Sequence, residues 1–405
     1  MAILEEYAKI VDPRQVQILQ RFSERLAGRT FLHVNSTATG GGVAEILHRM
    51  LPLLHELGLQ PRWAVMEAPP AFYETTKAFH NALQGQSGPL SPECYQCYLD
   101  VNRDNAARLD LEADFVLIHD PQPAALVETR RSGRWIWRCH VDVSHPNRVV
   151  WDFLKGFVER YDAAIFSAPQ FAQSLRIPQF MISPSIDPFS DKNRELTETE
   201  INAVLDRHGI PRDKPILLQV SRFDRFKDPL GVIRVYRRVK RFHDCQLVLA
   251  GGPASDDPEG ERVLEEVQEQ AAGDPDIHIL MLPPFSDLEI NALQRAADIV
   301  LQKSLREGFG LTVTEAMWKG KPVVAGAVGG IPLQIQDGLT GYLVHSEEGA
   351  AYRIRQLLHR PEEALRIGRA AREHVRRHFL LIRHAQEYLL LLVLLEHPDM
   401  SVVYL

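Results

Sequence analysis

Short apolar segments alternate with amphipathic ones through most of the chain. The apolar segments are residues 30–35, 62–66, 115–119, 134–139 and 163–166 in the first half, and 216–220, 246–250, 277–281, 299–302 and 322–325 in the second. They do not alternate strictly between apolar and polar positions, and helical stretches separate them. Parallel strands that are covered on both faces produce this pattern. We therefore predict an α/β protein with two doubly wound domains.

A segment rich in proline and serine, 179–193, separates the two halves and precedes a polar helix start at 196–210. This composition is typical of a linker, so we expect domains at 1–190 and 191–380. The segment 362–379 predicts a basic amphipathic helix with a solvated face. The following segment, 380–395, is more apolar and needs a surface to bury it, which the first domain could provide, so we assign about 381–405 to that domain.

The composition excludes several classes of protein. The chain has 405 residues, of which 45% are hydrophobic and 24% charged, as in folded soluble proteins. Its net charge of −7 gives no support for nucleic-acid binding. The longest apolar run, 389–395, is too short to span a bilayer, and the mixed, acidic N-terminus does not resemble a signal peptide. We expect a cytoplasmic protein with no membrane partner.

The four cysteines give little evidence of a metal or redox site. Only Cys94 and Cys97 have C-x-x-C spacing, and no second pair completes a zinc site. Reduced, structural thiols are the better interpretation.

The segment 39–54 begins with glycines directly after an apolar run and continues with helical spacing of apolar residues. Gly40, Gly41 and Gly42 therefore stand at a helix start, where unpaired amides and the helix dipole favour an anion. A complete G-x-G-x-x-G pattern is absent because Glu45 occupies the last position. A tight turn that needs glycine is an equally good explanation.

The segment 221-SRFDRFKDP-229 follows the first apolar run of the second half. In doubly wound domains ligands bind at the carboxyl ends of strands, which is where this segment lies. Arg222 and Lys227 could neutralise a diphosphate there. The alternative is a pair of solvated surface charges.

The segment 303–315 carries two carboxylates, Glu307 and Glu315, on either side of a turn. Gly308 and Gly310 permit the turn, and Thr312 is the expected cap of the helix that follows. A carboxylate one turn inside a helix suits hydroxyl binding better than acid–base catalysis, so we expect a ligand clamp rather than a hydrolase pair.

The segment 138-RCHVDVSHPN-147 ends another predicted strand and contains His140, Asp142 and His145. These side chains could bind a metal ion, but one aspartate and two histidines at the end of a strand are weak evidence for a metal site. A hydrogen-bonded structural role is the alternative for each histidine.

Taken in order, these four segments resemble the large family 4 of retaining glycosyltransferases, which includes glycogen synthase-like and sucrose synthase-like enzymes. The Glu-x7-Glu spacing of Glu307 and Glu315 and the segment 221–229 are the most specific marks. Within that family, 33–47, 135–147 and 302–325 look like the trehalose glycosyltransferring synthases. The resemblance implies the GT-B architecture, with two facing Rossmann-like domains, a central cleft and a C-terminal helix that crosses back.

The resemblance also implies an activity and its partners. These enzymes join a nucleoside-diphosphate glucose, with ADP or UDP, to free glucose and give α,α-trehalose, and we expect the reaction to be reversible. A trehalose phosphorylase, another family 4 glycosyltransferase, a nucleotide-sugar epimerase of similar fold and a non-catalytic nucleotide-sugar-binding protein remain alternatives. The nucleobase, the physiological direction and the oligomeric state stay open, with a homodimer as one possibility.

Each expected site residue takes its role from the resemblance. Arg222 and Lys227 are expected to hold the donor diphosphate, Glu307 the glucosyl hydroxyls and Glu315 the ribose hydroxyls. His140 is expected beside the donor sugar, near its O6. The other expected contacts are Gly308, Phe309, Gly310, Leu311 and Thr312 for sugar and phosphate, Lys303 for substrate, Gly41 and Gly42 for the diphosphate and acceptor, and Asn35 and Asp142 for the acceptor.

The resemblance further implies a front-face displacement without a covalent nucleophile. Glu307, His140, Arg222 and Lys227 are the residues expected to act in catalysis. No cofactor is expected to bind tightly, although Mg²⁺ from solution could assist the diphosphate.

Overall fold

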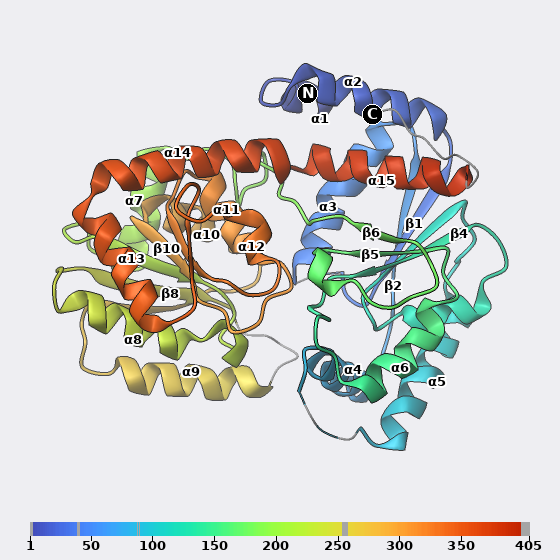
Figure 1. Cartoon of the computed structure of the whole chain (residues 1–405), viewed down its shortest axis with the longest axis horizontal. Coiled ribbons are helices and arrows are strands. Elements are labelled where there is room, and N and C mark those ends of the chain that lie inside the picture. Colours follow the sequence, from blue (N-terminus) through green and yellow to red (C-terminus); the bar gives the residue numbers. More distant parts are fainter. Residues whose placement is uncertain (1–2, 39–40, 87, 89, 253–257, 398–405) are drawn as a thin grey trace. The chain divides into compact units, whose positions relative to one another are not determined.

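The computed structural model describes residues 3–38, 41–86, 88, 90–252 and 258–397, and the chain forms two compact units (Figure 1). Unit 1 contains Met1–Ser185 and Leu381–Leu405, and unit 2 contains Ile186–Leu380. The chain thus leaves unit 1 once and returns to it with its last helix.

Unit 1 is built on a parallel sheet of six strands with the order β2-β1-β3-β4-β5-β6. The order reverses at β1, because β2 lies on one side of it and β3 on the other. The strands are β1 (Thr30–Asn35), β2 (Gln60–Val65), β3 (Phe115–His119), β4 (Arg134–Cys139), β5 (Ala163–Phe166) and β6 (Gln179–Met181).

Helices cover this sheet and bury its apolar side chains (Figure 1). They are α1 (Ile3–Tyr7), α2 (Pro13–Arg25), α3 (Gly41–Glu56), α4 (Pro70–Leu83), α5 (Pro92–Arg108), α6 (Arg148–Val158) and α15 (Leu381–Glu396), with short 3₁₀ helices η1 (Ala124–Thr129) and η2 (Pro169–Phe171). α2 begins where Asp12 accepts a hydrogen bond from the Arg14 amide and Pro13 fixes the first turn. α3 continues through Pro52 to Glu56.

The apolar helix α15 packs against α2 and α3 of unit 1. Leu389 and Leu392 are fully buried there. The apolar run 389–395 therefore finds its partner surface inside the protein.

Unit 2 repeats the architecture with a second parallel sheet of six strands, in the order β12-β11-β10-β7-β8-β9. Here the order reverses at β7, which lies between β8 and β10. The strands are β7 (Ile216–Val220), β8 (Gln246–Gly251), β9 (Ile277–Met281), β10 (Ile299–Gln302), β11 (Val323–Gly326) and β12 (Tyr342–Val344).

The described residues of unit 2 contain nine helical segments, some of which begin at a side-chain cap that the local sequence supplies. They are α7 (Glu198–Arg207), η3 (Arg225–Lys227), α8 (Pro229–Lys240), α9 (Pro258–Ala271), α10 (Asp287–Ala296), α11 (Leu311–Trp318), α12 (Ile331–Gln334), α13 (Glu347–His359) and α14 (Pro361–His378). α7 starts with a full capping box between Thr197 and Glu200, and Ser346 caps α13.

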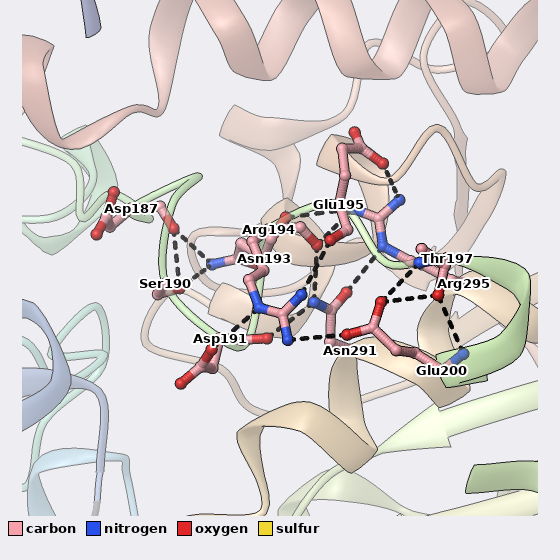
Figure 2. A network of polar contacts seen from close by, with 10 residues as sticks. All are labelled: Asp187, Ser190, Asp191, Asn193, Arg194, Glu195, Thr197, Glu200, Asn291 and Arg295. Atoms are coloured by element: carbon pink, nitrogen blue, oxygen red, sulfur yellow. Dashed lines mark hydrogen bonds and ion pairs between the residues drawn. The ribbon is translucent and has the colours of Figure 1, made fainter. Parts of the chain in front are cut away.

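The segment that opens unit 2 is fixed by a network of polar contacts with α10, shown in Figure 2. The side chain of Asn291 donates to the carbonyls of Asp191 (2.8 Å) and Arg194 (2.9 Å), and Arg295 donates to the Arg194 carbonyl at 2.8 Å. These donors satisfy backbone groups that the irregular segment cannot pair by itself.

All ten predicted strands are confirmed within two residues, and so is the α/β class with two Rossmann-like domains. Two edge strands, β6 and β12, were missed. Each has only three residues, and β6 lies in the segment that was interpreted as a linker.

Candidate active site

The residues expected to bind the donor gather at the carboxyl ends of β7 and β10 in unit 2. These strands are neighbours at the point where the strand order reverses. Arg222 and Lys227 follow β7, and Lys303 and Glu307 follow β10. Open parallel sheets bind ligands at this position, because the loops after adjacent strands diverge there.

The central contact is an ion pair between Lys227 and Glu307. Lys227 Nζ lies 2.6 Å from Glu307 Oε2, and the two side chains are 18% and 8% exposed. The same oxygen accepts a hydrogen bond from Ser304 Oγ at 3.1 Å, while Gln302 Nε2 lies 3.5 Å from it. The carboxylate is therefore held by donors from both loops.

The backbone after Glu307 turns tightly into α11. Gly310 adopts a left-handed conformation (φ 86°) as the N-cap residue, and a Cβ atom there would lie 3.2 Å from Glu307 Cγ. Gly329 (φ 52°) lies even closer to the backbone of Glu307, because an added Cβ would be 1.6 Å from the carbonyl oxygen of Glu307. Two glycines thus let the chain enclose Glu307.

The prediction that Thr312 caps α11 was wrong. The helix begins at Leu311, so Thr312 already lies in its first turn, and its hydroxyl lies 3.3 Å from Gln302 Oε1. Leu311 and Thr312 supply amides at this helix start, next to Gly308 and Phe309.

Glu315 lies one turn into α11, as expected, and is 2% exposed. Gln294 Nε2 lies 3.3 Å from its Oε2 atom. Arg222 is the most exposed of the expected site residues of unit 2 that carry a charge, with 51% of its side chain accessible and Asp224 Oδ2 at 3.6 Å. It is therefore available to a ligand.

Lys303 forms an ion pair with Asp228, a residue that the sequence analysis did not single out. Asp228 has φ 49° and caps α8 by accepting a hydrogen bond from the Gly231 amide at 3.0 Å. Its position directly before Pro229, at a helix start, was the available signal.

In unit 1 the expected residues lie after β1 and β4. Gly41 and Gly42 are exposed at the start of α3, as predicted, whereas Gly40 lies outside the described residues. Asn35 ends β1 and is 4% exposed. Its side chain accepts from Trp63 Nε1 (2.8 Å) and donates to the Thr37 carbonyl (2.7 Å), so the fold already uses both ends of this amide.

Asp142 and His145 belong to the turn before α6. Asp142 Oδ1 accepts hydrogen bonds from the backbone amide (3.0 Å) and the hydroxyl (2.6 Å) of Ser144. The Ser144 hydroxyl also lies 3.1 Å from His145 Nδ1. In the part of the chain that the structure describes, no group of three or more His, Cys, Asp or Glu side chains could hold a metal ion.

His140 follows β4 and is embedded in polar contacts. Its amide donates to Asp120 Oδ1 at 2.7 Å, and its Nε2 atom lies 3.1 Å from Arg138 Nε and 3.2 Å from His119 Nδ1. Burial and the charge of Arg138 lower the pKa of His140 well below its usual value. The ring is therefore neutral near pH 7.

Asp120, His119 and Arg138 surround His140 but were not predicted as site residues. Asp120 has φ 67°, and burial raises its pKa to about 7, against the effects of the His140 amide and Arg138. The pair His119-Asp120 stands at the carboxyl end of β3, next to β1. This is the same kind of position that identified Arg222, so the signal was present in the sequence.

Two further expectations concern the cysteines and membrane-spanning helices. Cys94, Cys97, Cys139 and Cys245 are free thiols. None of the described helices is long and apolar enough to cross a bilayer.

Comparison with known proteins assigns both units. Residues 33–173 match the family model of the trehalose synthase N-terminal domain, and residues 201–374 match that of the glycosyl transferases group 1. The two matches fall on the two Rossmann-like units in turn.

Relatives of known activity cover almost the whole chain. Trehalose synthase from Pyrococcus horikoshii is 49% identical over 393 residues, which are 95% of this chain and 95% of that protein. Trehalose phosphorylase from Pleurotus pulmonarius is more distant, with 27% identity over 84% of this chain and 54% of that protein.

Solved structures show the same fold. The α,α-trehalose-phosphate synthase (UDP-forming) from Burkholderia xenovorans has a TM-score of 0.73 and 14% identity, and the match covers 90% of this chain and 100% of that one. With the near-complete match to a trehalose synthase, this fold shows that the chain belongs to the trehalose synthase family and is a glycosyltransferase of the GT-B fold.

Proposed function

We propose that the protein transfers glucose from a nucleoside-diphosphate glucose to free glucose, giving α,α-trehalose and the nucleoside diphosphate, in a reversible reaction. Trehalose-related glycosyl transfer follows from the family. The nucleotide donor, the free glucose acceptor and the reversibility are the parts that we propose.

The observation that carries the nucleotide donor is the Lys227–Glu307 ion pair at the carboxyl ends of β7 and β10. A phosphate needs cations, and a sugar needs hydroxyl acceptors. This pair holds one of each, 2.6 Å apart, and the exposed guanidinium of Arg222 belongs to the same loop as Lys227. Lys227 and Arg222 then bind the diphosphate, while Glu307 accepts hydrogen bonds from the glucosyl hydroxyls.

The start of α11 supplies further donors to the same substrate. The amides of Gly308 to Thr312 stand at a helix N-terminus, where they stabilise negative charge that develops on the leaving diphosphate. Glu315 is nearly buried one turn into this helix and would accept from the ribose hydroxyls. A Mg²⁺ ion that assists would bind mainly to the diphosphate oxygens, which it helps to neutralise.

The chemistry needs no covalent nucleophile in this proposal. The bond from the anomeric carbon to the diphosphate oxygen breaks, and the acceptor hydroxyl forms a new bond on the same face of the sugar. The departing phosphate oxygen takes the proton of that hydroxyl, so atoms and charges balance. Neutral His140 acts as a hydrogen-bond donor to the glucosyl O6, while Gly41, Gly42 and the Asp142 turn receive the acceptor.

The second candidate is a phosphate-dependent cleavage of trehalose. The observation in its favour is the 27% identity to the fungal phosphorylase. Orthophosphate could occupy the place of the diphosphate next to Lys227, so the cations alone do not separate the two reactions.

The test is to incubate the purified protein with trehalose and ADP or UDP, and separately with trehalose and orthophosphate. Products are separated by chromatography. Nucleoside-diphosphate glucose with free glucose supports the proposal and ranks the nucleotides. Glucose 1-phosphate formed without a nucleotide would replace the proposal with the phosphorylase. No product in either incubation would contradict both.

A further inference from the structure

Three histidines from adjacent strands form a hydrogen-bonded row inside unit 1. His33 Nδ1 lies 3.1 Å from His119 Nε2, and His119 Nδ1 lies 3.2 Å from His140 Nε2. Consecutive rings are nearly parallel, with interplanar angles of 19° and 15°. They come from β1, from β3 and from the end of β4, which are neighbours in the sheet. The row ends at the expected site residue His140.

Arg138 sets the direction of every hydrogen bond in this row. Its Nε–H group lies 3.1 Å from His140 Nε2, and a guanidinium can only donate. His140 Nε2 must therefore be the unprotonated nitrogen, and the ring proton must be on Nδ1. If His140 Nε2 also carried a proton, its N–H group would point at the N–H group of Arg138 Nε.

The proton positions of the other two rings follow from the same argument. Because His140 Nε2 accepts, His119 Nδ1 carries a proton and donates, which leaves His119 Nε2 as an acceptor for His33 Nδ1–H. His33 Nε2 then has no proton, and it is a buried atom without a hydrogen-bond partner. All three rings are thus neutral and protonated on Nδ1.

The surroundings favour neutral rings. His33 and His119 are 0% and 2% exposed, and burial lowers the pKa values of both. Arg138 is fully buried, and its guanidinium lies over the ring of Tyr388 at 5.3 Å. The other charged or titratable groups near the row are Asp120 after β3, and His384, Arg383 and Glu387 on α15.

His33 closes the row inside the core, so the row cannot conduct protons to another group. His140 is the only partly exposed ring of the three, and no described residue accepts from its Nδ1–H group. What the row can do is fix which nitrogen of His140 offers a hydrogen.

We propose that His119 and His33, together with Arg138, are positioning residues that hold His140 as a neutral Nδ1–H donor for a sugar hydroxyl. The hydrogen bond from His140 to a sugar hydroxyl rests on the proposed function, whereas the assignment of the tautomer does not. A sugar oxygen can accept this hydrogen without any change in the charge of the site. A ring that was free to exchange tautomers would present its lone pair to the same oxygen for part of the time.

The first test needs only the wild-type protein and no activity. Two-bond ¹⁵N–¹H correlation spectra of the ¹⁵N-histidine-labelled full chain distinguish protonated from unprotonated ring nitrogens, and single histidine variants assign the signals. We expect Nδ1–H tautomers for all three rings at pH 7. An Nε2–H tautomer or an imidazolium at His140 would overturn the proposal, whatever reaction the enzyme catalyses.

The second test compares two substitutions in the same core. His119→Phe removes the donor to His140, whereas His384→Phe removes a fully buried histidine that pairs with Ser185 Oγ (2.9 Å) outside the row. We expect His119→Phe to mix the tautomers of His140 and to lower kcat roughly tenfold, as for other groups that orient a site residue. KM for the nucleotide, which binds to unit 2, should stay within about twofold.

His384→Phe should change neither the His140 spectrum nor kcat by more than about twofold. His119→Asn retains an N–H donor close to the place of Nδ1 and should recover part of kcat. Equal losses in the two phenylalanine variants, or an unchanged His140 spectrum in His119→Phe, would overturn the proposal. A protein without trehalose activity but with the expected spectra would contradict only the proposed function.

Discussion

At the scale of single residues, the Lys227–Glu307 pair is the contact on which the proposed donor binding rests. Both side chains are mostly buried, so each loses hydration when the protein folds. That loss offsets much of their mutual attraction, and a buried ion pair is therefore weak evidence for stability. Its place at the strand ends where a sheet binds ligands gives it a better explanation as preorganised substrate chemistry.

Glu307→Gln keeps the shape of the side chain and removes its charge. We expect kcat/KM for trehalose synthesis to fall by about 100-fold or more, the usual effect of losing a positioned polar group in a transition state. Ser304 and Gln302 still contact the amide, so unit 2 should remain folded. Initial rates and far-UV circular dichroism measure the two effects.

Glu266→Gln is the matched control, because Glu266 pairs with Arg225 at 3.1 Å on a more exposed surface of the same unit. Exposed pairs contribute little, so its kcat/KM should stay within about twofold of wild type. Near-normal turnover of Glu307→Gln would remove Glu307 from the site.

At the scale of elements, the opening segment of unit 2 is tied to the helices that carry the site. Figure 2 shows Arg295 of α10 within this network, and a further contact joins Trp318 Nε1 of α11 to the carbonyl of Asn193 at 3.2 Å. Lys319 Nζ also reaches Asn193 Oδ1 at 3.0 Å. α11 carries Glu315, so the segment holds the helix that we expect to bind the ribose.

Arg295→Met should destabilise unit 2. The change leaves the buried side-chain oxygen of Asn291 without its donor and removes one of the two donors to the Arg194 carbonyl. An unsatisfied buried polar group of this kind costs about 1–3 kcal/mol. Urea unfolding, with hydrogen exchange of α10 and α11 as the local probe, would measure it.

Glu195→Gln separates this effect from the ion pair. Glu195 pairs with Arg295 at 2.6 Å but is 62% exposed, so its loss should cost less than about 1 kcal/mol. If Glu195→Gln and Arg295→Met lower the free energy of unfolding equally, the ion pair with Glu195 accounts for the effect, and the hydrogen bonds from Arg295 to the backbone contribute little.

At the scale of the whole molecule, unit 1 is assembled from both ends of the chain. α15 follows unit 2 in the sequence but packs on α2 and α3 of unit 1 (Figure 1). The buried row of histidines adjoins it, because Tyr388 of α15 lies under Arg138. A change near the C-terminus should therefore act on the fold of the first strands.

Leu389→Ala tests this dependence. Leu389 is fully buried, and truncating such a leucine costs about 2–5 kcal/mol. We expect faster hydrogen exchange in β1 and β3, with β7 unchanged. The control is Leu365→Ala on α14, where the side chain is 61% exposed. Equal effects on β3 and β7 would contradict the division into units.

The buried histidines should also make unit 1 sensitive to acid. Burial lowers the pKa of His33 from 6.5 to about 3, so below pH 6.5 the unfolded chain binds a proton that the native protein does not. Stability that is fully present above pH 6.5 is then lost as pH falls, by about 1.4 kcal/mol per pH unit for each such histidine. Asp120 acts in the opposite sense between pH 3.8 and about 7, because burial raises its pKa.

Replacing one member of the row should flatten this dependence. In the His33→Phe variant the unfolded chain has one fewer histidine that can take up a proton. The slope of the unfolding free energy against pH, between pH 6 and 5, should therefore fall by about 1.4 kcal/mol per pH unit. Urea unfolding followed by tryptophan fluorescence reports mainly on unit 1, which holds four of the five tryptophans, Trp63, Trp135, Trp137 and Trp151. His55→Gln, an exposed substitution, is the control, and identical slopes in both variants would contradict the linkage.

The sequence by itself determined ten of the strands, the fold class and the loops in which we expect the donor-binding residues. Apolar runs such as 115–119 specify buried strands locally, and in parallel sheets the loops after the strands gather at one edge. The loops that contain Arg222, Lys227 and Glu307 could therefore be placed at one edge of a sheet without coordinates. The short edge strands β6 and β12 escaped because three residues carry almost no periodic signal.

The tertiary structure alone decided contacts between residues that are distant in the chain. Thr312 looked like a helix cap by its chemistry, but the N-cap residue of α11 is Gly310, two residues earlier, which adopts the left-handed turn next to Glu307. The sequence analysis singled out neither His33 nor His119, which are 86 positions apart. Strand order and register bring them together, because a side chain's partners depend on which strands become neighbours, and no local pattern encodes that choice.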